Sequence, residues 1–220
     1  MSELIIIAGP QAAGKSTIIS QICSQYQAVS PFISSSKKRK PILFPLQESR
    51  QIIAHKEILL GAIFMTAEQE EEVVNCDLGR MDLILRRSRE RVIYLDECNI
   101  FTIAHAMAHG VKDINKHWSE YIVHLEKLNA KIIFLNIDPE ISWERRCRKY
   151  EQRLVYFPVN RHKAIMRRYR EYLKRLHPLL LSVYHRLPFS KEMLDGKMPQ
   201  QEAIQKVSGA LVRMSKYLKS

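Results

Sequence analysis

Short apolar runs rich in β-branched residues alternate along the chain with longer amphipathic segments. The continuous runs Leu4–Ala8, Arg91–Leu95 and Lys131–Ile137 have the length and composition of strands that are buried on both faces. Pro41–Phe44 and Met193–Leu194 predict two further short strands. Because helical patterns separate these runs, the sequence predicts parallel βαβ units in a three-layer α/β/α sandwich with a sheet of about five strands.

The segments between the predicted strands have the apolar periodicity of helices. A capping box at Thr66 opens one helix, which we expect to continue, with a break near Gly79, to about Arg89. Asp138 followed by Pro139 predicts another helix start, since proline is favoured in the first turn. The other predicted helices cover residues 15–25, 47–64, 99–108, 115–129, 162–185 and 199–218.

Length and composition restrict the class of protein. The 220 residues, 46% of them hydrophobic, suit one globular domain spanning residues 1–220. No apolar run approaches the roughly 20 residues of a membrane helix, and the first residues lack the pattern of a secretory leader. The four cysteines are scattered without a Cys-x-x-Cys pair, which favours reduced thiols. We therefore expect a cytoplasmic protein with no membrane partner.

The formal net charge of +12 is compatible with a polyanionic partner such as a nucleic acid. Much of this excess lies between Arg145 and Arg186, where 13 lysines and arginines accompany 2 acids. Two interpretations stay open at this point. The segment could hold phosphates, or it could be a solvated helix face, which is what runs of charge usually are.

One motif indicates specific chemistry. The segment Gly9–Ser16 satisfies G-x-x-x-x-G-K-[ST] and lies directly between a predicted strand and a predicted helix. Its glycines let backbone N–H groups surround phosphate oxygens, and the helix adds its N-terminal dipole. Lys15 would reach the β- and γ-phosphates, and the Ser16 hydroxyl would bind Mg²⁺. The predicted nucleotide-binding residues are Gly9, Gln11, Ala12, Ala13, Gly14, Lys15, Ser16 and Thr17.

Two acids, Asp96 and Glu97, directly follow a predicted strand. Ligands bind at the carboxyl ends of strands in open α/β sheets, and a carboxylate there can hold Mg²⁺ or accept a proton from an acceptor hydroxyl. Asp96 is our first choice for the metal-binding and catalytic acid, and Glu97 follows as a residue of the acceptor site. The alternative is a surface acid pair that caps the next helix.

Arginines in the basic segment are candidates for a clamp on the transferring phosphoryl group. Arg145 and Arg148 are spaced i, i+3 and share a helix face, with Arg146 and Arg153 close by. Planar guanidinium groups near a nucleotide stabilise charge that develops during transfer. We assign catalytic roles to Arg145, Arg148 and Arg153, although a solvated basic helix would have the same pattern.

Candidates for the acceptor site come from two other helices. Glu48 could act as general base and Arg50 could bind an anionic acceptor, since both follow the predicted second strand. An exposed helix N-terminus is an equal explanation for these two residues, because the helix dipole favours an acid there. Arg80 lies on a predicted helix and is a further candidate for binding the acceptor.

These features resemble the P-loop nucleoside and nucleotide kinases, nearest in layout to the thymidylate kinase and deoxynucleoside kinase branch. The resemblance rests on residues 9–17, 92–97, 134–148 and 193–203. It implies a P-loop NTP hydrolase fold with a small helical lid at residues 141–160, and a turn near residues 195–198 beside the adenine base. It also implies ATP and Mg²⁺ as cofactors and transfer of the γ-phosphoryl group to a small-molecule acceptor.

The sequence departs from this family at one position. An arginine usually follows the acid at the end of the third strand, whereas this chain continues Asp96-Glu97-Cys98. The arginine that binds the acceptor would then come from elsewhere, such as Arg50 or Arg80.

Three functions remain open from the sequence. The leading interpretation is a kinase of a nucleotide or nucleoside. The alternatives are a kinase of a non-nucleotide hydroxyl, such as an antibiotic or a sugar, and a P-loop ATPase or GTPase switch that binds nucleic acid or protein. An arginine-rich lid that excludes water favours a kinase, and the sequence has no Asn-Lys-x-Asp run for guanine. A homodimer is compatible with each of these functions.

Overall fold

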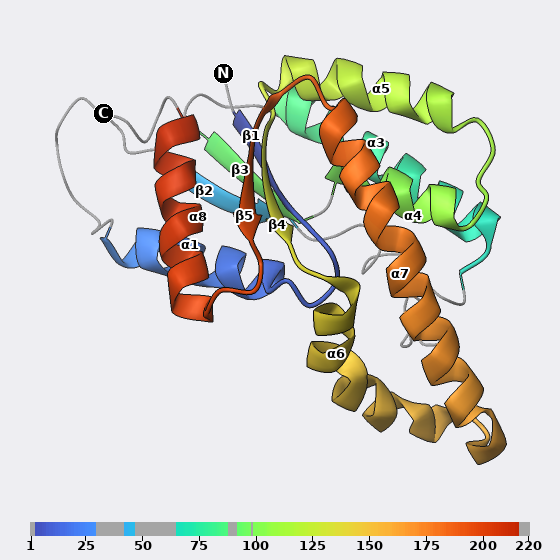
Figure 1. Cartoon of the computed structure of the whole chain (residues 1–220). Coiled ribbons are helices and arrows are strands. Elements are labelled where there is room, and N and C mark those ends of the chain that lie inside the picture. The colour runs from blue at the N-terminus through green and yellow to red at the C-terminus, as the bar shows by residue number, and fades with distance from the viewer. Residues whose placement is uncertain (1–2, 30–41, 47–64, 88–91, 98, 216–220) are drawn as a thin grey trace, which may run out of the picture.

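The computed structural model describes residues 3–29, 42–46, 65–87, 92–97 and 99–215. Within these residues, five strands form one sheet in the order β2-β3-β1-β4-β5, and every pairing is parallel (Figure 1). The predicted parallel sheet is thereby confirmed. The strands are β1 (Glu3–Ala8), β2 (Ile42–Leu46), β3 (Val92–Glu97), β4 (Lys131–Asn136) and β5 (Ser190–Asp195).

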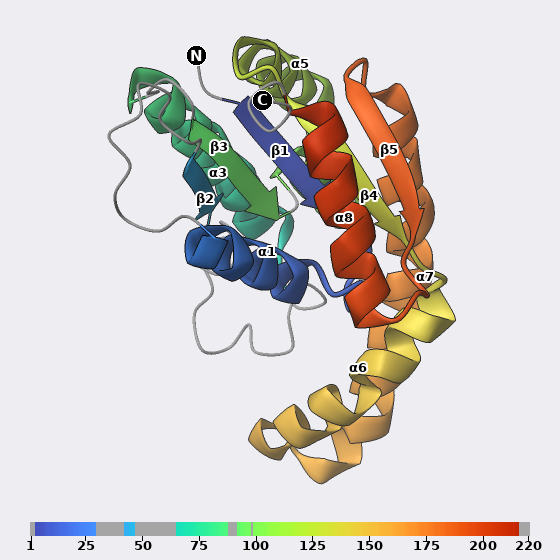
Figure 2. The same ribbon diagram turned by 90° about the vertical axis from the view of Figure 1, so that its left-hand side faces the viewer.

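Helices cover both faces of the sheet, as the predicted three-layer sandwich requires. The first and last helices, α1 and α8, lie on one face, while α3, α4, α5 and α7 lie on the other (Figure 1 and Figure 2). The predicted helix 47–64 lies outside the described residues. The α-helices are α1 (Lys15–Val29), α3 (Ala67–Arg87), α4 (Thr102–Ala108), α5 (Ile114–Lys127), α6 (Pro139–Arg153), α7 (His162–Arg186) and α8 (Gln200–Met214).

The packing of the central strand β1 explains why residues 4–8 are apolar without interruption. Leu4 and Ile6 pack into the core formed with α3, α4, α5 and α7, whereas Ile5 and Ile7 pack into the core formed with α1 and α8. Successive side chains of a strand point to opposite faces, so a strand covered on both sides needs apolar residues at every position.

Helix α3 begins as predicted but has no break. The Gln69 amide N–H donates to Thr66 Oγ1 at 3.3 Å, and the Thr66 N–H donates to Gln69 Oε1 at 3.0 Å, which is the capping box. The predicted break near Gly79 is wrong, because the helix runs from Ala67 to Arg87 through this residue. An exposed glycine weakens a helix by only about 1 kcal/mol, and the neighbouring Leu78 and Met81 are buried in the core.

An arm of two helices extends from the sheet. Figure 1 and Figure 2 show α6 continuing beyond the carboxyl end of β4 and α7 returning beside it. The Asp138 side chain caps α6 by accepting from the Glu140 N–H at 2.8 Å, as the sequence predicted. Two 3-10 turns, Leu154–Tyr156 and Val159–Arg161, join the two helices. Residues 141–160, for which a lid stays a prediction, lie in α6 and these turns.

Among the described helices, none combines the length and the apolarity that a bilayer-spanning segment requires.

Candidate active site

The loop between β1 and α1 has the backbone that the motif predicts. Gly9, Ala12 and Gly14 all have positive φ angles, at +142°, +63° and +86°. A Cβ atom at Gly9 would lie 2.3 Å from the carbonyl oxygen of Leu135 on the neighbouring strand β4. Glycine is therefore required at this position both by the backbone angle and by the close approach of β4.

Lys15 and Ser16 begin α1 and face the end of β3. Lys15 Nζ donates to the carbonyl oxygens of Gly9 and Pro10 at 3.1 and 3.0 Å and lies 3.7 Å from Glu97 Oε1. Ser16 Oγ donates to Glu97 Oε2 at 2.5 Å. A hydroxyl beside a carboxylate is a fitting donor set for Mg²⁺, which takes one or two carboxylates and completes its shell with phosphate oxygens and water.

Helix α6 contacts the same loop from the opposite side. Ser142 Oγ donates to the carbonyl oxygen of Gln11 at 2.5 Å, and Arg145 Nη1 lies 3.3 Å from that of Ala12. Four consecutive carbonyl oxygens, from Gly9 to Ala12, thus accept hydrogen bonds from side chains. The N–H groups of the loop are the donors that a phosphate would use.

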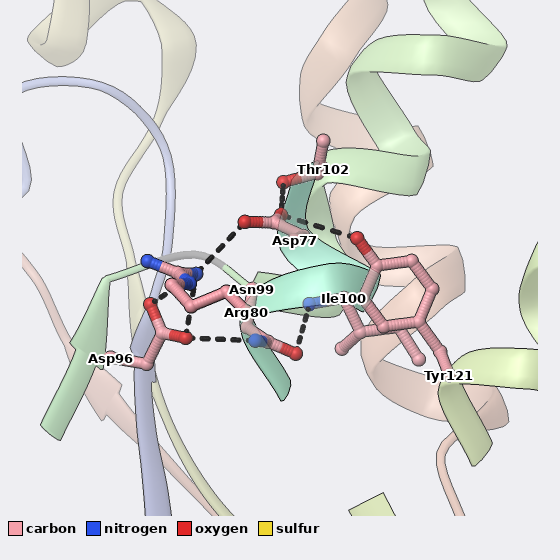
Figure 3. A network of polar contacts seen from close by, with 7 residues as sticks. All are labelled: Asp77, Arg80, Asp96, Asn99, Ile100, Thr102 and Tyr121. Atoms are coloured by element: carbon pink, nitrogen blue, oxygen red, sulfur yellow. Dashed lines mark hydrogen bonds and ion pairs between the residues drawn. The ribbon is translucent and has the colours of Figure 1, made fainter. Parts of the chain in front are cut away.

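Asp96, our first choice for the metal-binding acid, lies in a different environment. Its side chain is fully buried, accepts from Asn99 Nδ2 at 2.8 Å and pairs with Arg80 Nη2 at 2.9 Å (Figure 3). Neighbouring residues of a strand point to opposite faces. Asp96 therefore turns toward α3, while Glu97 turns toward α1, where Ser16 and Lys15 lie. The geometry favours Glu97 over Asp96 as the acid of the phosphate site.

Arg80 belongs to the same buried network. Its Nη2 also lies 2.8 Å from Asp77 Oδ1, and Asp77 Oδ2 accepts from Thr102 Oγ1 at 2.7 Å and Tyr121 OH at 3.2 Å (Figure 3). Burial alone would lower the pKa of Arg80, but the carboxylates of Asp96 and Asp77 outweigh it and raise that pKa. The predicted acceptor-binding arginine thus stands beside the end of β3, held between two carboxylates.

Replacing Asp96 by asparagine is expected to lower the free energy of unfolding by about 2–3 kcal/mol, because the buried Arg80 would lose one of the two carboxylates that pair with it in the described part of the chain. Denaturant unfolding followed by circular dichroism measures this change. The control is Asp82→Asn, which removes a carboxylate that pairs with His124 but is 54% exposed. It should change stability far less. Equal losses in the two variants would contradict a structural role for Asp96.

Arg145 connects the P-loop to the turn between β5 and α8. Besides Ala12, its guanidinium donates to the carbonyl oxygens of Gly196 at 2.9 Å and Lys197 at 3.4 Å. The side chain also lines a cavity of about 340 Å³ between this turn and the start of α1. The cavity lies beside the turn at residues 195–198, where the nucleotide base was predicted. Its other lining residues are Ala13, Gly14, Thr17, Ile18, Leu135, Gly196, Lys197, Met198, Pro199, Gln200 and Ala203.

Among the described arginines of α6, Arg146 is one whose pKa responds to the carboxylate of Glu97. Its Nη1 donates to Tyr150 OH at 3.3 Å. Burial alone would lower the pKa of Arg146, but Tyr150, Tyr169 and the carboxylate of Glu97 raise it. We did not assign Arg146 from the sequence, because a run of arginines does not reveal which of them faces inward.

The remaining predicted residues are not brought into this site by the described part of the structure. Arg148 is exposed on α6. Glu48, Arg50 and the side chain of Arg153 lie outside the described residues.

Comparison with solved structures identifies the fold. The structure of deoxyadenosine kinase from M. mycoides with bound dATP matches 95% of this chain and 98% of its own length, with a TM-score of 0.52 and 14% sequence identity. The chain has the fold of this deoxynucleoside kinase. No protein-family model matches the sequence, and no curated protein matches it either. The α/β fold with a parallel sheet expected from the strand layout is thereby confirmed.

Proposed function

We propose that the protein is a kinase that transfers the γ-phosphoryl group of ATP, in the presence of Mg²⁺, to a nucleoside or nucleotide. The observation that carries this proposal is the convergence of Lys15, Ser16 and Glu97 at the P-loop. A cation, a hydroxyl and a carboxylate lie there within hydrogen-bonding or ion-pairing distance, at the carboxyl end of the sheet. This is the set that a bound triphosphate and its metal ion require.

The donor nucleotide has a defined path in this proposal. Its base would occupy the cavity beneath Arg145 and beside Gly196, and its phosphates would extend over the loop that begins at Gly9. The N-terminus of α1 points its dipole and its N–H groups at the same position. A triphosphate bound in this way would end at Lys15, and Glu97 and Arg146 would then be the residues available to its γ-phosphoryl group.

Each side chain has a separate task in the transfer. Lys15 would balance charge on the β- and γ-phosphates, and Arg146 would approach the γ-phosphoryl group from the arm. Ser16 and Glu97 would hold Mg²⁺, which neutralises charge on the bridging oxygens when it is bound. Most of the rate enhancement then comes from positioning and electrostatics. Glu48 remains our candidate for orienting the acceptor hydroxyl.

Within this class of acceptors, the contacts of Arg80 favour a nucleoside over a nucleotide. Its guanidinium already pairs with Asp77 and Asp96, so this group brings no excess positive charge to the end of β3. Within the described part of this network, two carboxylates accompany one arginine, so the network itself would repel an acceptor phosphate but not an uncharged sugar hydroxyl. The fold neighbour is named as a kinase of a nucleoside, which agrees with this preference.

The test is phosphoryl transfer from γ-labelled ATP with Mg²⁺, with the Lys15→Ala protein as the blank. The panel contains nucleosides, nucleoside monophosphates, sugars, aminoglycosides and 5′-hydroxyl oligonucleotides. Label in one nucleoside, absent from the blank, is the expected result. Label in a sugar or an aminoglycoside would show a kinase of another hydroxyl. Label that reaches only water, faster with nucleic acid, would show an ATPase switch instead.

A further inference from the structure

Gln11 occupies one of the variable positions of the phosphate-binding motif, yet both its side chain and its carbonyl group accept hydrogen bonds from the arm. Its side-chain Oε1 accepts hydrogen bonds from the hydroxyls of Tyr150 on α6, at 3.0 Å, and Tyr169 on α7. Its carbonyl oxygen accepts from Ser142 on α6. Both helices of the arm therefore bind one residue of the P-loop.

The two tyrosines that contact Gln11 are buried and lie against each other. Tyr150 and Tyr169 are 2% and 1% exposed, and their ring centroids lie 3.9 Å apart. Burial raises the pKa of Tyr169 well above its ordinary value, so its hydroxyl stays protonated and able to donate near neutral pH. Gln11 Oε1 has two lone pairs, and the two hydroxyls use both of them.

The hydroxyl of Tyr150 also connects the loop to Arg146, whose pKa the carboxylate of Glu97 helps to raise. Tyr150 OH accepts from Arg146 Nη1 while it donates to Gln11. Any displacement of α6 that separated Tyr150 from Gln11 would therefore also move Arg146. The contacts connect the conformation of the phosphate loop and the position of this guanidinium through a single oxygen atom.

We propose that Gln11, Tyr150 and Tyr169 form a clasp that positions the P-loop and couples its conformation to the arm. Neither tyrosine is expected to touch a bound nucleotide, so both are positioning residues that act through Gln11 and Arg146. The consequence for phosphate binding rests on the proposed function. The effect on the loop itself does not, because the contacts exist within the protein alone.

The test uses the double variant Tyr150→Phe with Tyr169→Phe, which removes both hydroxyls and keeps both rings. Amide hydrogen exchange of peptides that span residues 9–17 is measured without nucleotide, and the Kd for ATP with Mg²⁺ is measured by calorimetry. Loss of donors to a buried acceptor is expected to speed the exchange of these amides by about tenfold and to weaken ATP binding by about tenfold. Gln11→Met, which removes the acceptor, should have the same effects.

The matched control is Tyr172→Phe. Tyr172 is also a buried tyrosine of α7, and its hydroxyl contacts His105 Nδ1 on α4 at 2.6 Å. This variant should leave both the P-loop exchange and the Kd unchanged, even if it unfolds at a lower temperature. A double variant that behaves like Tyr172→Phe would overturn the clasp. If the wild-type protein binds no ATP, the proposed function fails, and the exchange comparison still decides the clasp.

Discussion

Replacement of Glu97 by glutamine is expected to lower the turnover number by about 10²–10³-fold, the usual effect of removing one electrostatic group from an active site. The amide keeps the shape of the side chain but loses the negative charge that faces Ser16 and Lys15. A neutral oxygen binds Mg²⁺ more weakly, so the variant should also need more Mg²⁺ for half-maximal rate. Initial rates from γ-labelled ATP, measured over a range of Mg²⁺ concentrations, test both effects.

Two control variants separate this effect from general damage. Glu171→Gln removes a carboxylate that pairs with Arg167 on the exposed surface of α7, and it should not change the rate. Asp96→Asn should lower stability but leave the Mg²⁺ requirement of the folded protein unchanged. If Asp96→Asn raised that requirement and Glu97→Gln did not, Asp96 would be the metal-binding acid after all.

Replacement of Lys15 by alanine is expected to reduce the turnover number by at least about 10²–10³-fold with the fold retained. The side chain is only 6% exposed, and its ammonium group is the cation that lies closest to Glu97 among the ion pairs of the described residues. Without it, the charge on the β- and γ-phosphates would lose its cationic partner in the loop. Arginine at this position should not restore the rate, because its planar fork does not replace a compact ammonium.

Another buried lysine provides the control for this variant. Lys131 Nζ pairs with Glu3 Oε1 at 2.6 Å. The two residues begin β4 and β1, so this pair lies at the amino ends of the strands, whereas the P-loop follows the carboxyl end of β1. Lys131→Ala should destabilise the protein, because it leaves Glu3 buried without its cation, but its folded fraction should keep the wild-type turnover number. Equal losses of turnover in the two variants would indicate unfolding rather than lost catalysis.

Most of the fold could be predicted from local patterns. Strands β1 and β4 are covered on both faces, so residues 4–8 and 132–135 are apolar without interruption, and this makes the two strands visible in the sequence. The start of α6 was visible because a capping Asp138 precedes Pro139. The order of the strands was not predicted, because it depends on which helices pair across the sheet. The predicted helix break at Gly79 was wrong because the packing of its neighbours outweighs the low helix propensity of glycine.

The site was predicted only where its chemistry is contained in one segment. The motif from Gly9 to Ser16 fixes the phosphate loop by spacing alone. The choice between Asp96 and Glu97 needed the strand register, which pairs Asp96 with Ile6 and Glu97 with Ile7 on opposite faces of the sheet. No pattern in a single sequence tells which of those faces carries α1.

Contacts between distant segments could not be predicted at all. Tyr169 lies 158 positions after the Gln11 that it binds, and Tyr150 lies 139 positions after it. A tyrosine in an amphipathic helix has the same sequence signature whether its hydroxyl meets another core residue or the P-loop. The basic character of α7 was apparent from composition, but the inward-facing tyrosines among those charges were not.

The four engaged carbonyl oxygens from Gly9 to Ala12 have a thermodynamic consequence. Fixing the backbone of a residue costs about 1–2 kcal/mol of conformational entropy at room temperature. In a loose loop this cost would be subtracted from the affinity for the ligand that ordered it. Here Lys15, Ser142 and Arg145 fix the loop when the chain folds. The part of this cost that is met on folding is then not subtracted from the affinity for a bound phosphate.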